Sequence, residues 1–255
     1  MAIHAVVNEA GSAGKTTTAV TLAAILAESG RRTLLWDNDA QGNATLFVGV
    51  QAAQGKTAAE VLVGERSLDE VIVPTVVDRL YVVPADRNLH GALIQLTRDF
   101  GGEQRIRVAL DAVAGQYDAV IIDCPGAASV LTIAALVASR SVLAVATPSL
   151  KELEGLPNLE ETIAKVRGMY KPDLYLSAVI PCMVPPASAG ALYVEGQERL
   201  RDAYGDLVTP PVRRSVRVPE AYSQRVPLTV HAPFEQITAD YQAVTDFLIG
   251  KKVLP

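Results

Sequence analysis

The chain has little of several residue types, and each shortage excludes a class of protein. Its 255 residues include two cysteines, Cys124 and Cys182, which are too few for a disulfide framework and indicate a reducing compartment. Only 5% of the residues are aromatic while 49% are hydrophobic. The core must therefore be mostly aliphatic, as in sheets that are covered by helices on both faces. The three histidines, at positions 4, 90 and 231, are scattered and form no metal-binding pattern.

Membrane and secretion signals are also lacking. No apolar run reaches the roughly 20 residues that are needed to span a bilayer, and no basic segment followed by an apolar one opens the chain. The net charge of −5 gives no overall attraction to nucleic acid, so DNA binding would have to come from a local basic patch. We therefore expect a soluble, cytoplasmic protein.

Strand-like and helix-like segments alternate along the chain. Because such alternation produces right-handed βαβ units, it predicts an α/β fold with a doubly wound, mostly parallel sheet and helices on both faces. No repeat or linker divides the sequence, so we expect residues 1–255 to form a single domain. The expected strands are Ile3–Val7, Thr33–Trp36, Leu80–Val83, Ala119–Ile122, Ser141–Ala146 and Leu174–Ile180. The expected helices are Thr16–Glu28, Ala58–Val63, Gly91–Val113, Val130–Ala138, Gly155–Gly168, Val194–Tyr204 and Phe234–Leu248.

A phosphate-binding loop is predicted directly after the first strand, in the segment Gly11-Ser12-Ala13-Gly14-Lys15-Thr16-Thr17. Successive backbone N–H groups of such a loop wrap a phosphate, and the N-terminus of the following helix adds a positive dipole. Lys15 is expected to reach the β- and γ-phosphates, and the Thr16 hydroxyl to ligate Mg²⁺. Glu9 stands where the general pattern has its first glycine, so that pattern is not met literally.

Two further segments place carboxylates at strand ends. Asp123 ends the hydrophobic run Val120-Ile121-Ile122, where an acidic residue of a nucleotide site holds Mg²⁺ through water; an aspartate there can also simply form a turn. Asp37 and Asp39 follow the second strand on a loop rich in asparagine and glycine. Such a loop can move with the nucleotide state, and one of its carboxylates can orient the attacking water.

Together these segments resemble the ParA/MinD family of deviant Walker-A ATPases, and the run Asp39-Ala40-Gln41-Gly42-Asn43-Ala44-Thr45 resembles its ParA branch. Other matching segments are Pro84-Ala85-Asp86, Asp123-Cys124-Pro125, Leu131-Thr132, Leu153-Glu154-Gly155-Leu156 and Val216-Arg217-Val218-Pro219-Glu220-Ala221. The resemblance implies an ATPase with ATP and Mg²⁺ as cofactors that forms a sandwich homodimer when ATP is bound. It also implies that Asp39 orients water, that Asp37 lies near the Mg²⁺ shell and that residues 126–129 belong to a second switch.

The base site follows from strand-end geometry together with this resemblance. Pro181, Met183 and Pro211 are expected around the adenine, because ligands of open α/β sheets bind outside the carboxyl ends of the strands. The preference for adenine over guanine rests on the resemblance, since no base-reading motif is present.

One position departs from the family pattern. The family has a signature lysine five residues before the phosphate-loop lysine, and this chain has Ala10 there. A cation opposite the developing phosphate charge contributes roughly 10³-fold or more in rate. Lys151 lies just past a strand end, and we hypothesise that it restores the missing cation, in cis or across the dimer; the alternative is a solvated lysine paired with Glu152 or Glu154. A family member without the signature lysine resembles the McdA type, which spaces carboxysomes over the nucleoid; a plasmid-partition ParA is the competing interpretation.

The densest basic run contains Arg213, Arg214 and Arg217, and the resemblance implies that this region contributes to a DNA-binding face. Arginines on phosphates bind DNA without sequence preference and with strong salt dependence. The alternative is a solvated loop whose arginines pair within the chain, for example with Glu220. The resemblance further implies a nucleoid-associated protein whose hydrolysis is stimulated by a cargo adaptor of the ParB or McdB kind.

Other classes fit the sequence less well. A membrane-surface ATPase of the MinD kind needs an amphipathic anchor, whereas the tail 247–254 more plausibly packs on the core, so no stable membrane association is expected. A signal-recognition GTPase needs an Asn-Lys-x-Asp motif after a late strand, and Lys171-Pro172-Asp173 precedes one. The two cysteines lack the spacing of an iron–sulfur site. A non-catalytic, ATP-gated binding module is a further alternative, because the signature lysine is replaced by Ala10.

Overall fold

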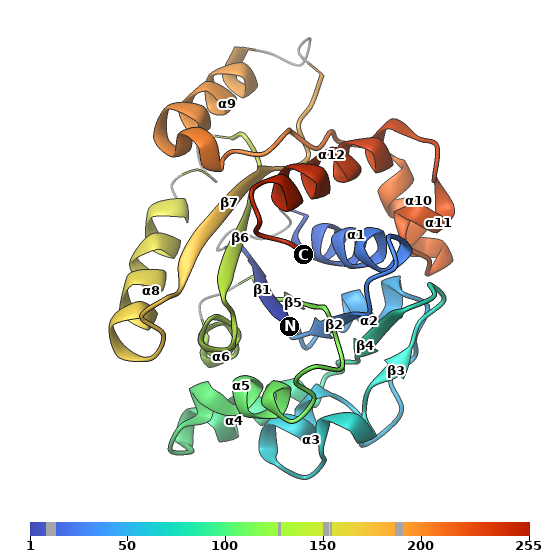
Figure 1. Cartoon of the computed structure of the whole chain (residues 1–255), viewed down its shortest axis with the longest axis vertical. Coiled ribbons are helices and arrows are strands. Elements are labelled where there is room, and N and C mark those ends of the chain that lie inside the picture. The colour runs from blue at the N-terminus through green and yellow to red at the C-terminus, as the bar shows by residue number, and fades with distance from the viewer. Residues whose placement is uncertain (9–13, 127–128, 150–152, 154, 187–190) are drawn as a thin grey trace.

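The computed structural model describes residues 1–8, 14–126, 129–149, 153, 155–186 and 191–255 (Figure 1). In these ranges the centre is a seven-stranded sheet in the order β3-β4-β2-β5-β1-β6-β7. Neighbouring strands run parallel, except that β3 is antiparallel to β4 at one edge. The predicted doubly wound, mostly parallel α/β fold is thereby confirmed. The strands are β1 (Ala2–Val7), β2 (Thr33–Asp37), β3 (Val73–Pro74), β4 (Leu80–Val83), β5 (Ala119–Asp123), β6 (Ser141–Ala146) and β7 (Tyr175–Pro181).

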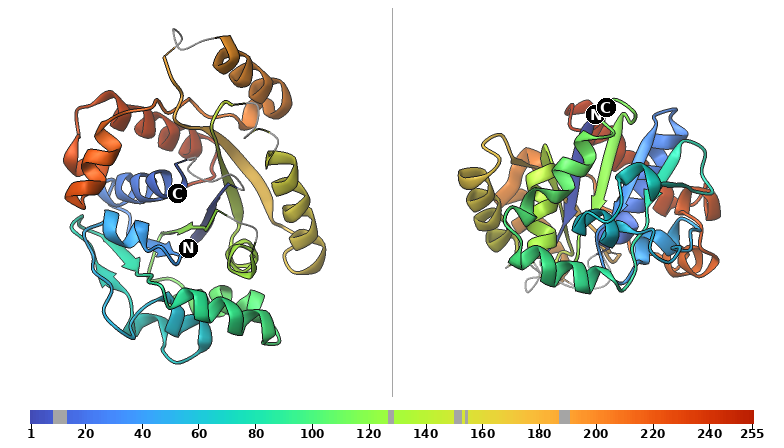
Figure 2. Two further views of the ribbon diagram at one scale, coloured as in Figure 1. Left: turned by 180° about the vertical axis from the view of Figure 1, so that it is seen from behind. Right: turned by 90° about the horizontal axis from the view of Figure 1, so that it is seen from below.

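Helices cover both faces of the sheet. α1 (Lys15–Glu28) and α12 (Gln236–Gly250) lie side by side on one face, and α6 (Val130–Ala138) and α8 (Gly155–Met169) lie on the other (Figures 1 and 2). None of the helices in the described ranges is long and apolar enough to cross a membrane. The remaining helices are α2 (Asn43–Phe47), α3 (Ala58–Val63), α4 (Leu89–Arg98), α5 (Arg105–Asp111), α9 (Ala191–Tyr204), α10 (Arg217–Gln224) and α11 (Leu228–His231), with 3-10 turns η1 (Leu68–Glu70), η2 (Gly102–Gln104) and η4 (Gly205–Leu207).

Each central strand contributes side chains to two separate apolar cores, one on each face of the sheet. Side chains along a strand alternate between the two faces of the sheet. In β2, Leu34 and Trp36 therefore join the core under α6 and α8, while Leu35 joins the core under α1 and α12. All three side chains are fully buried. Burial on both faces explains why these strands are continuous apolar runs in the sequence.

The prediction of a single helix over Gly91–Val113 is wrong. The segment is divided into α4 and α5 by a turn at Gly101 and Gly102. Gly101 has a left-handed backbone with φ of 78°, and a Cβ on Gly102 would lie 2.3 Å from the carbonyl oxygen of Leu96. Glycine permits both features, and the chain turns there instead of continuing the helix. The short elements β3, α2, α10 and α11 were not predicted.

Candidate nucleotide-binding site

The helix that follows the predicted phosphate loop begins at Lys15. Gly14 precedes it with φ of 90°, a left-handed backbone that favours glycine. Lys15 is largely buried, with 8% of its surface exposed. The Asn8 side chain, just after β1, donates a hydrogen bond to the backbone oxygen of Val145, which ties the entry of the loop to β6. The predicted phosphate ligands at positions 11, 12 and 13 and the departure at position 10 lie outside the described residues.

Two buried carboxylates end adjacent strands beside this helix. Asp37 of β2 is in register with Asp123 of β5, and both side chains are fully buried. Asp37 accepts hydrogen bonds from the backbone N–H and the hydroxyl of Thr45, at 2.8 and 2.6 Å. Neither carboxylate oxygen of Asp123 accepts a hydrogen bond of standard geometry within the described part of the chain, although the Thr16 side chain lies close enough to act on it.

Burial disfavours the charged form of both carboxylates and raises their pKa values. Burial raises the pKa of Asp37 to about 6. Burial and then the charge of Asp37 raise the pKa of Asp123 well above its usual range, while Thr16 and Lys15 act in the opposite direction, which places both near this carboxylate. The structure thus brings together the predicted magnesium residues Thr16, Asp37 and Asp123.

The orphaned oxygens of Asp123 fit a magnesium ion. Mg²⁺ prefers oxygen ligands and is held by one or two carboxylates together with substrate phosphates and water. A bound cation would compensate the negative charge of two adjacent buried carboxylates. No cluster of three or more His, Cys, Asp or Glu side chains suited to a metal occurs among the described residues, so this donor set fits an ion that shares its shell with phosphates rather than an all-protein cage.

Thr45 is a residue of the candidate site that the sequence analysis did not assign. Besides holding Asp37, its hydroxyl oxygen accepts the backbone N–H of Ala85 at 2.9 Å, which joins α2 to the end of β4. The only signal in the sequence was its place at the end of the ParA-like run. Two hydrogen bonds from Thr45 fix the orientation of Asp37. No hydrogen bond of standard geometry fixes Asp123 in the same way within the described residues.

Asp39, predicted to orient water, lies on the loop between β2 and α2. Its backbone N–H donates to the Asp37 carboxylate at 3.2 Å, and its own carboxylate accepts the backbone N–H of Gln41 at 3.0 Å. The loop closes at Gly42, which has φ of 65°. Asp39 is partly exposed and lies two residues from a buried carboxylate, but its role with water stays a prediction.

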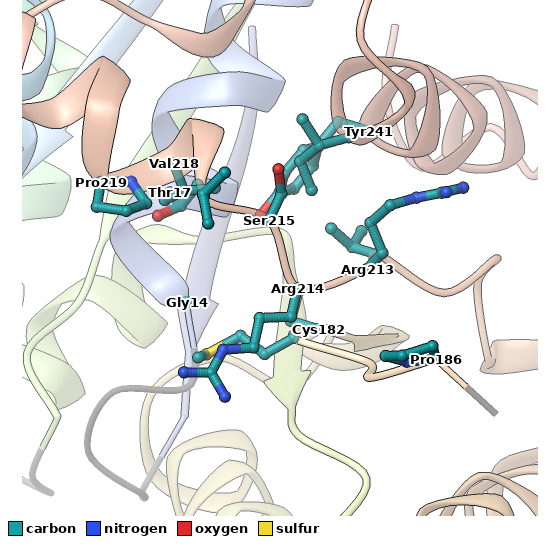
Figure 3. A pocket seen from close by; sticks show the side chains of 14 residues that line it. Gly14, Thr17, Cys182, Pro186, Arg213, Arg214, Ser215, Val218, Pro219 and Tyr241 are labelled. Atoms are coloured by element: carbon teal, nitrogen blue, oxygen red, sulfur yellow. The ribbon is translucent and has the colours of Figure 1, made fainter. Parts of the chain in front are cut away.

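A cavity of about 600 Å³ opens beside the start of α1 (Figure 3). Its walls come from α1, the end of β7, the segment before α10, and α12. The two loop walls are joined by backbone hydrogen bonds from Val212 to Pro181 at 2.7 Å and from Val184 to Val212 at 3.0 Å. The lining residues are Gly14, Thr17, Cys182, Met183, Pro186, Val212, Arg213, Arg214, Ser215, Val216, Val218, Pro219, Ile237 and Tyr241.

The predicted base-site residues divide in two groups. Met183 lines the cavity and has φ of 55°, an uncommon left-handed backbone for a residue other than glycine. Pro181 and Pro211 flank the cavity without being among its lining residues; Pro181 instead holds Val212 through its carbonyl oxygen. The predicted place of the base therefore coincides with a real hollow, although the assignment of a base to it stays a prediction.

A buried polar cluster supports the inner wall of the cavity. The Thr18 hydroxyl lies 3.2 Å from the Tyr241 hydroxyl and 3.5 Å from the sulfur of Cys182. Burial raises the pKa of Cys182 to about 11, so the thiol is protonated at neutral pH and is no nucleophile. The cluster connects α1, the end of β7 and α12; sequence reasoning missed it because its members are far apart in the chain.

The arginine run is mostly neutralised within the chain. Arg213 pairs with Asp240 at 2.6 Å, and Arg217 pairs with Glu220 and Glu235 at 2.9 and 3.1 Å. These contacts match the alternative of intramolecular pairing that the sequence had left open. Arg214 also lines the cavity, and no ion pair of its side chain is seen within the described residues. Lys151, the proposed replacement cation, lies outside the described residues.

Comparison with known proteins finds relatives that match most of the chain. A family model described as an AAA domain matches residues 1–176. The sporulation initiation inhibitor protein Soj of Bacillus subtilis is 38% identical over 234 residues, covering 91% of each chain. The chromosome partitioning protein ParA of Caulobacter vibrioides is 36% identical, covering 90% of this chain and 86% of the relative.

Solved structures show the same fold. The apo structure of McdA from Cyanothece superposes with a TM-score of 0.89 at 22% identity, covering 97% of this chain and 99% of the other. The structure of cobyrinic acid a,c-diamide synthase from Mycobacterium smegmatis, with a bound ATP analogue and magnesium, has a TM-score of 0.84 at 28% identity and covers 98% and 94% of the two chains.

Proposed function

The chain belongs to the ParA/MinD family of P-loop ATPases, and we propose that it is an ATP-driven switch that binds non-specific DNA as a dimer and partitions a cargo. The main support is the pair formed by Asp37 and Asp123 at the start of α1. Buried carboxylates that the protein leaves in part unpartnered are costly unless a ligand uses them. A nucleotide with Mg²⁺ is the ligand class that matches both them and Lys15.

In this proposal each site residue has a role. The backbone of residues 11–17 and the Lys15 ammonium bind the phosphates, while Thr16 and Asp123 hold Mg²⁺ with Asp37 beside it. The ion supplies positive charge next to the β- and γ-phosphates when bound. The Asp39 carboxylate orients water for hydrolysis to ADP and phosphate, and the base occupies the cavity near Met183, between the loops at Pro181 and Pro211.

Lys151 is proposed as the cation that replaces the family's signature lysine. Substitution Lys151→Ala is then expected to lower ATP turnover by roughly 10³-fold and to weaken ATP-dependent dimerisation. A matched control is Lys165→Ala, because Lys165 pairs with Glu161 on the surface of α8 at 2.7 Å. Unchanged dimerisation and turnover in the Lys151 variant would remove this residue from the mechanism.

The cargo is proposed from the relatives. The two curated relatives at 36–38% identity carry names from chromosome partitioning and sporulation, which favours DNA as the cargo, with an adaptor of the ParB kind that stimulates hydrolysis. The carboxysome alternative, with an adaptor of the McdB kind, rests on Ala10 and on a fold likeness at 22% identity. With either cargo the protein is nucleoid-associated in this proposal, because the ATP-bound dimer binds non-specific DNA of the nucleoid.

The C-terminal tail supports DNA rather than a membrane as that surface. A membrane anchor needs a free apolar face. Leu248 is fully buried, and Val253 and Leu254 are 9% and 3% exposed, in the core under α1 and α12. Inserting them into lipid would first require removing them from this core.

A titration of non-specific duplex DNA tests the proposal. Binding is expected only with ATP and Mg²⁺, not with ADP or without nucleotide, and it should weaken steeply between two salt concentrations. Binding in no nucleotide state would overturn the DNA assignment. ATP turnover measured with and without DNA separates an ATPase from a non-catalytic ATP-gated module, in which binding is normal and turnover is absent.

A further inference from the structure

We propose that Arg214 belongs to the nucleotide site instead of a DNA-binding surface, and that its guanidinium binds phosphate groups of the nucleotide. The inference rests on the proposed function and adds a binding residue to it. Arg214 lines the cavity together with Gly14 and Thr17 at the start of α1. Figure 3 shows its guanidinium extending toward Gly14 and Cys182, the end of the cavity that is nearest to α1.

The backbone explains why two adjacent arginines serve different purposes. Residues 212–214 are extended and pair with residues 181–184: Arg214 donates its backbone N–H to Val184 at 3.0 Å, and Arg213 forms a parallel bridge with Val184. Successive side chains of extended backbone point to opposite sides. The Arg213 side chain is therefore turned toward α12, where Asp240 holds it, while the Arg214 side chain reaches across the cavity (Figure 3).

The charges around the two arginines differ in the same way. Arg213 and Arg217 are each paired with carboxylates of α10 or α12. Within the described residues the Arg214 side chain forms no ion pair, although it lines a cavity whose other lining side chains are uncharged apart from Arg213. A guanidinium on this wall is complementary to an anionic ligand. Its planar fork of donors matches phosphate oxygens in a bidentate manner, which fits a chain with alanine at the signature position.

The test compares Arg214→Gln with Arg217→Gln, a substitution of the same kind at an arginine of the same run that does not line the cavity. Binding of ATP, ADP and adenosine to the full chain is measured calorimetrically in the presence of Mg²⁺. We expect Arg214→Gln to weaken the binding of ATP and ADP about 10- to 100-fold and to leave the binding of adenosine unchanged, whereas Arg217→Gln leaves the binding of all three unchanged. Arg214→Lys should be intermediate, because it keeps the charge and loses the fork. Thermal unfolding without nucleotide checks that the variants are folded.

Each other outcome overturns the inference in a recognisable way. Equal weakening of ATP and adenosine by Arg214→Gln would place the guanidinium on the base. Unchanged ATP binding with reduced DNA affinity of the ATP-saturated protein would return Arg214 to the DNA face. Unchanged binding of every ligand would exclude both roles. If the unsubstituted chain binds no ATP, the proposed function itself fails and this inference fails with it.

Discussion

Asp240 of α12 accepts three hydrogen bonds from Arg213: two from the guanidinium, at 2.6 and 2.8 Å, and one from the backbone N–H at 3.1 Å. This carboxylate is largely covered, with 13% of its side chain exposed. An arginine held in this way must leave its partner before it can bind a DNA phosphate. The charge of Arg213 is thus masked by the C-terminal helix.

We predict that Asp240→Asn unmasks Arg213. The affinity of the ATP-bound protein for non-specific duplex should rise several-fold at low salt, and the slope of log affinity against log salt should steepen by about 1, the value for one added phosphate contact. Stability should change by less than about 1 kcal/mol, because Arg213 is exposed. The double variant with Arg213→Gln should restore the original slope. An unchanged slope in the single variant would exclude Arg213 from the DNA interface.

Asp123→Asn should separate stability from function. Because burial raises the pKa of Asp123 well above its usual range, the fold of the nucleotide-free protein disfavours the charged carboxylate, and a neutral amide removes that cost. We expect the free energy of unfolding by urea to increase, within the range of roughly 0.5–2 kcal/mol that is usual for a single stabilising substitution, and ATP turnover to be lost. Asp78→Asn, at a fully exposed carboxylate, is the control for both measurements. If the Asp123→Asn variant unfolds more easily than the unsubstituted protein, the buried Asp123 carboxylate does not destabilise the fold.

Gly42→Ala should displace the loop that carries Asp39. A Cβ there would lie 2.7 Å from the carbonyl oxygen of Ala85, and φ is 65°. Gly55→Ala is a matched control with φ of 70° and nothing within 4 Å of the added Cβ. In both variants alanine in the left-handed backbone lowers the free energy of unfolding by about 1 kcal/mol. Only in Gly42→Ala does the close contact lower it further, by about 1–3 kcal/mol. Equal unfolding midpoints for the two variants would show that the close approach is tolerated.

His4 should make stability fall in mild acid. Burial and then the charge of Arg140 lower the pKa of His4 to about 4 from 6.5. The neutral form is thus favoured in the fold, and its contribution is present above pH 6.5 and is lost as the pH falls toward 4. For this group the loss between pH 7 and pH 5 is about 2 kcal/mol. Replacing His4 by Gln should remove that part of the loss, whereas replacing the exposed His90 should not; urea unfolding at the two pH values measures the difference.

Much of the site could be predicted because its motifs are continuous in the chain. The phosphate loop, Asp37 and Asp123 each follow a strand that is apolar on both faces, and parallel strands end at the same edge of a sheet. Their convergence beside α1 therefore followed from the order of the elements. The break between α4 and α5 was missed, since Gly101 and Gly102 interrupt a helical pattern that otherwise continues.

The arginine run shows where sequence reasoning ends. Three arginines within five positions, from Arg213 to Arg217, read as one basic patch. The structure separates them, because Asp240 lies 27 residues after Arg213 and meets it only when α12 packs beside α1. The cluster of Thr18 and Tyr241 spans 223 residues and depends on the same packing.

The sequence by itself determined the alternation of strands and helices, the α/β class and the position of the phosphate loop, because each of these depends on local periodicity and on residues that adjoin one another. The tertiary structure alone decided that Thr45 holds Asp37, that the Asp123 carboxylate accepts no hydrogen bond of standard geometry in the described part of the chain, and that Arg213 and Arg214 point to different sides. These relationships depend on which surfaces meet when helices pack on the sheet, and a pattern along one chain does not contain the distances between segments that are far apart in it.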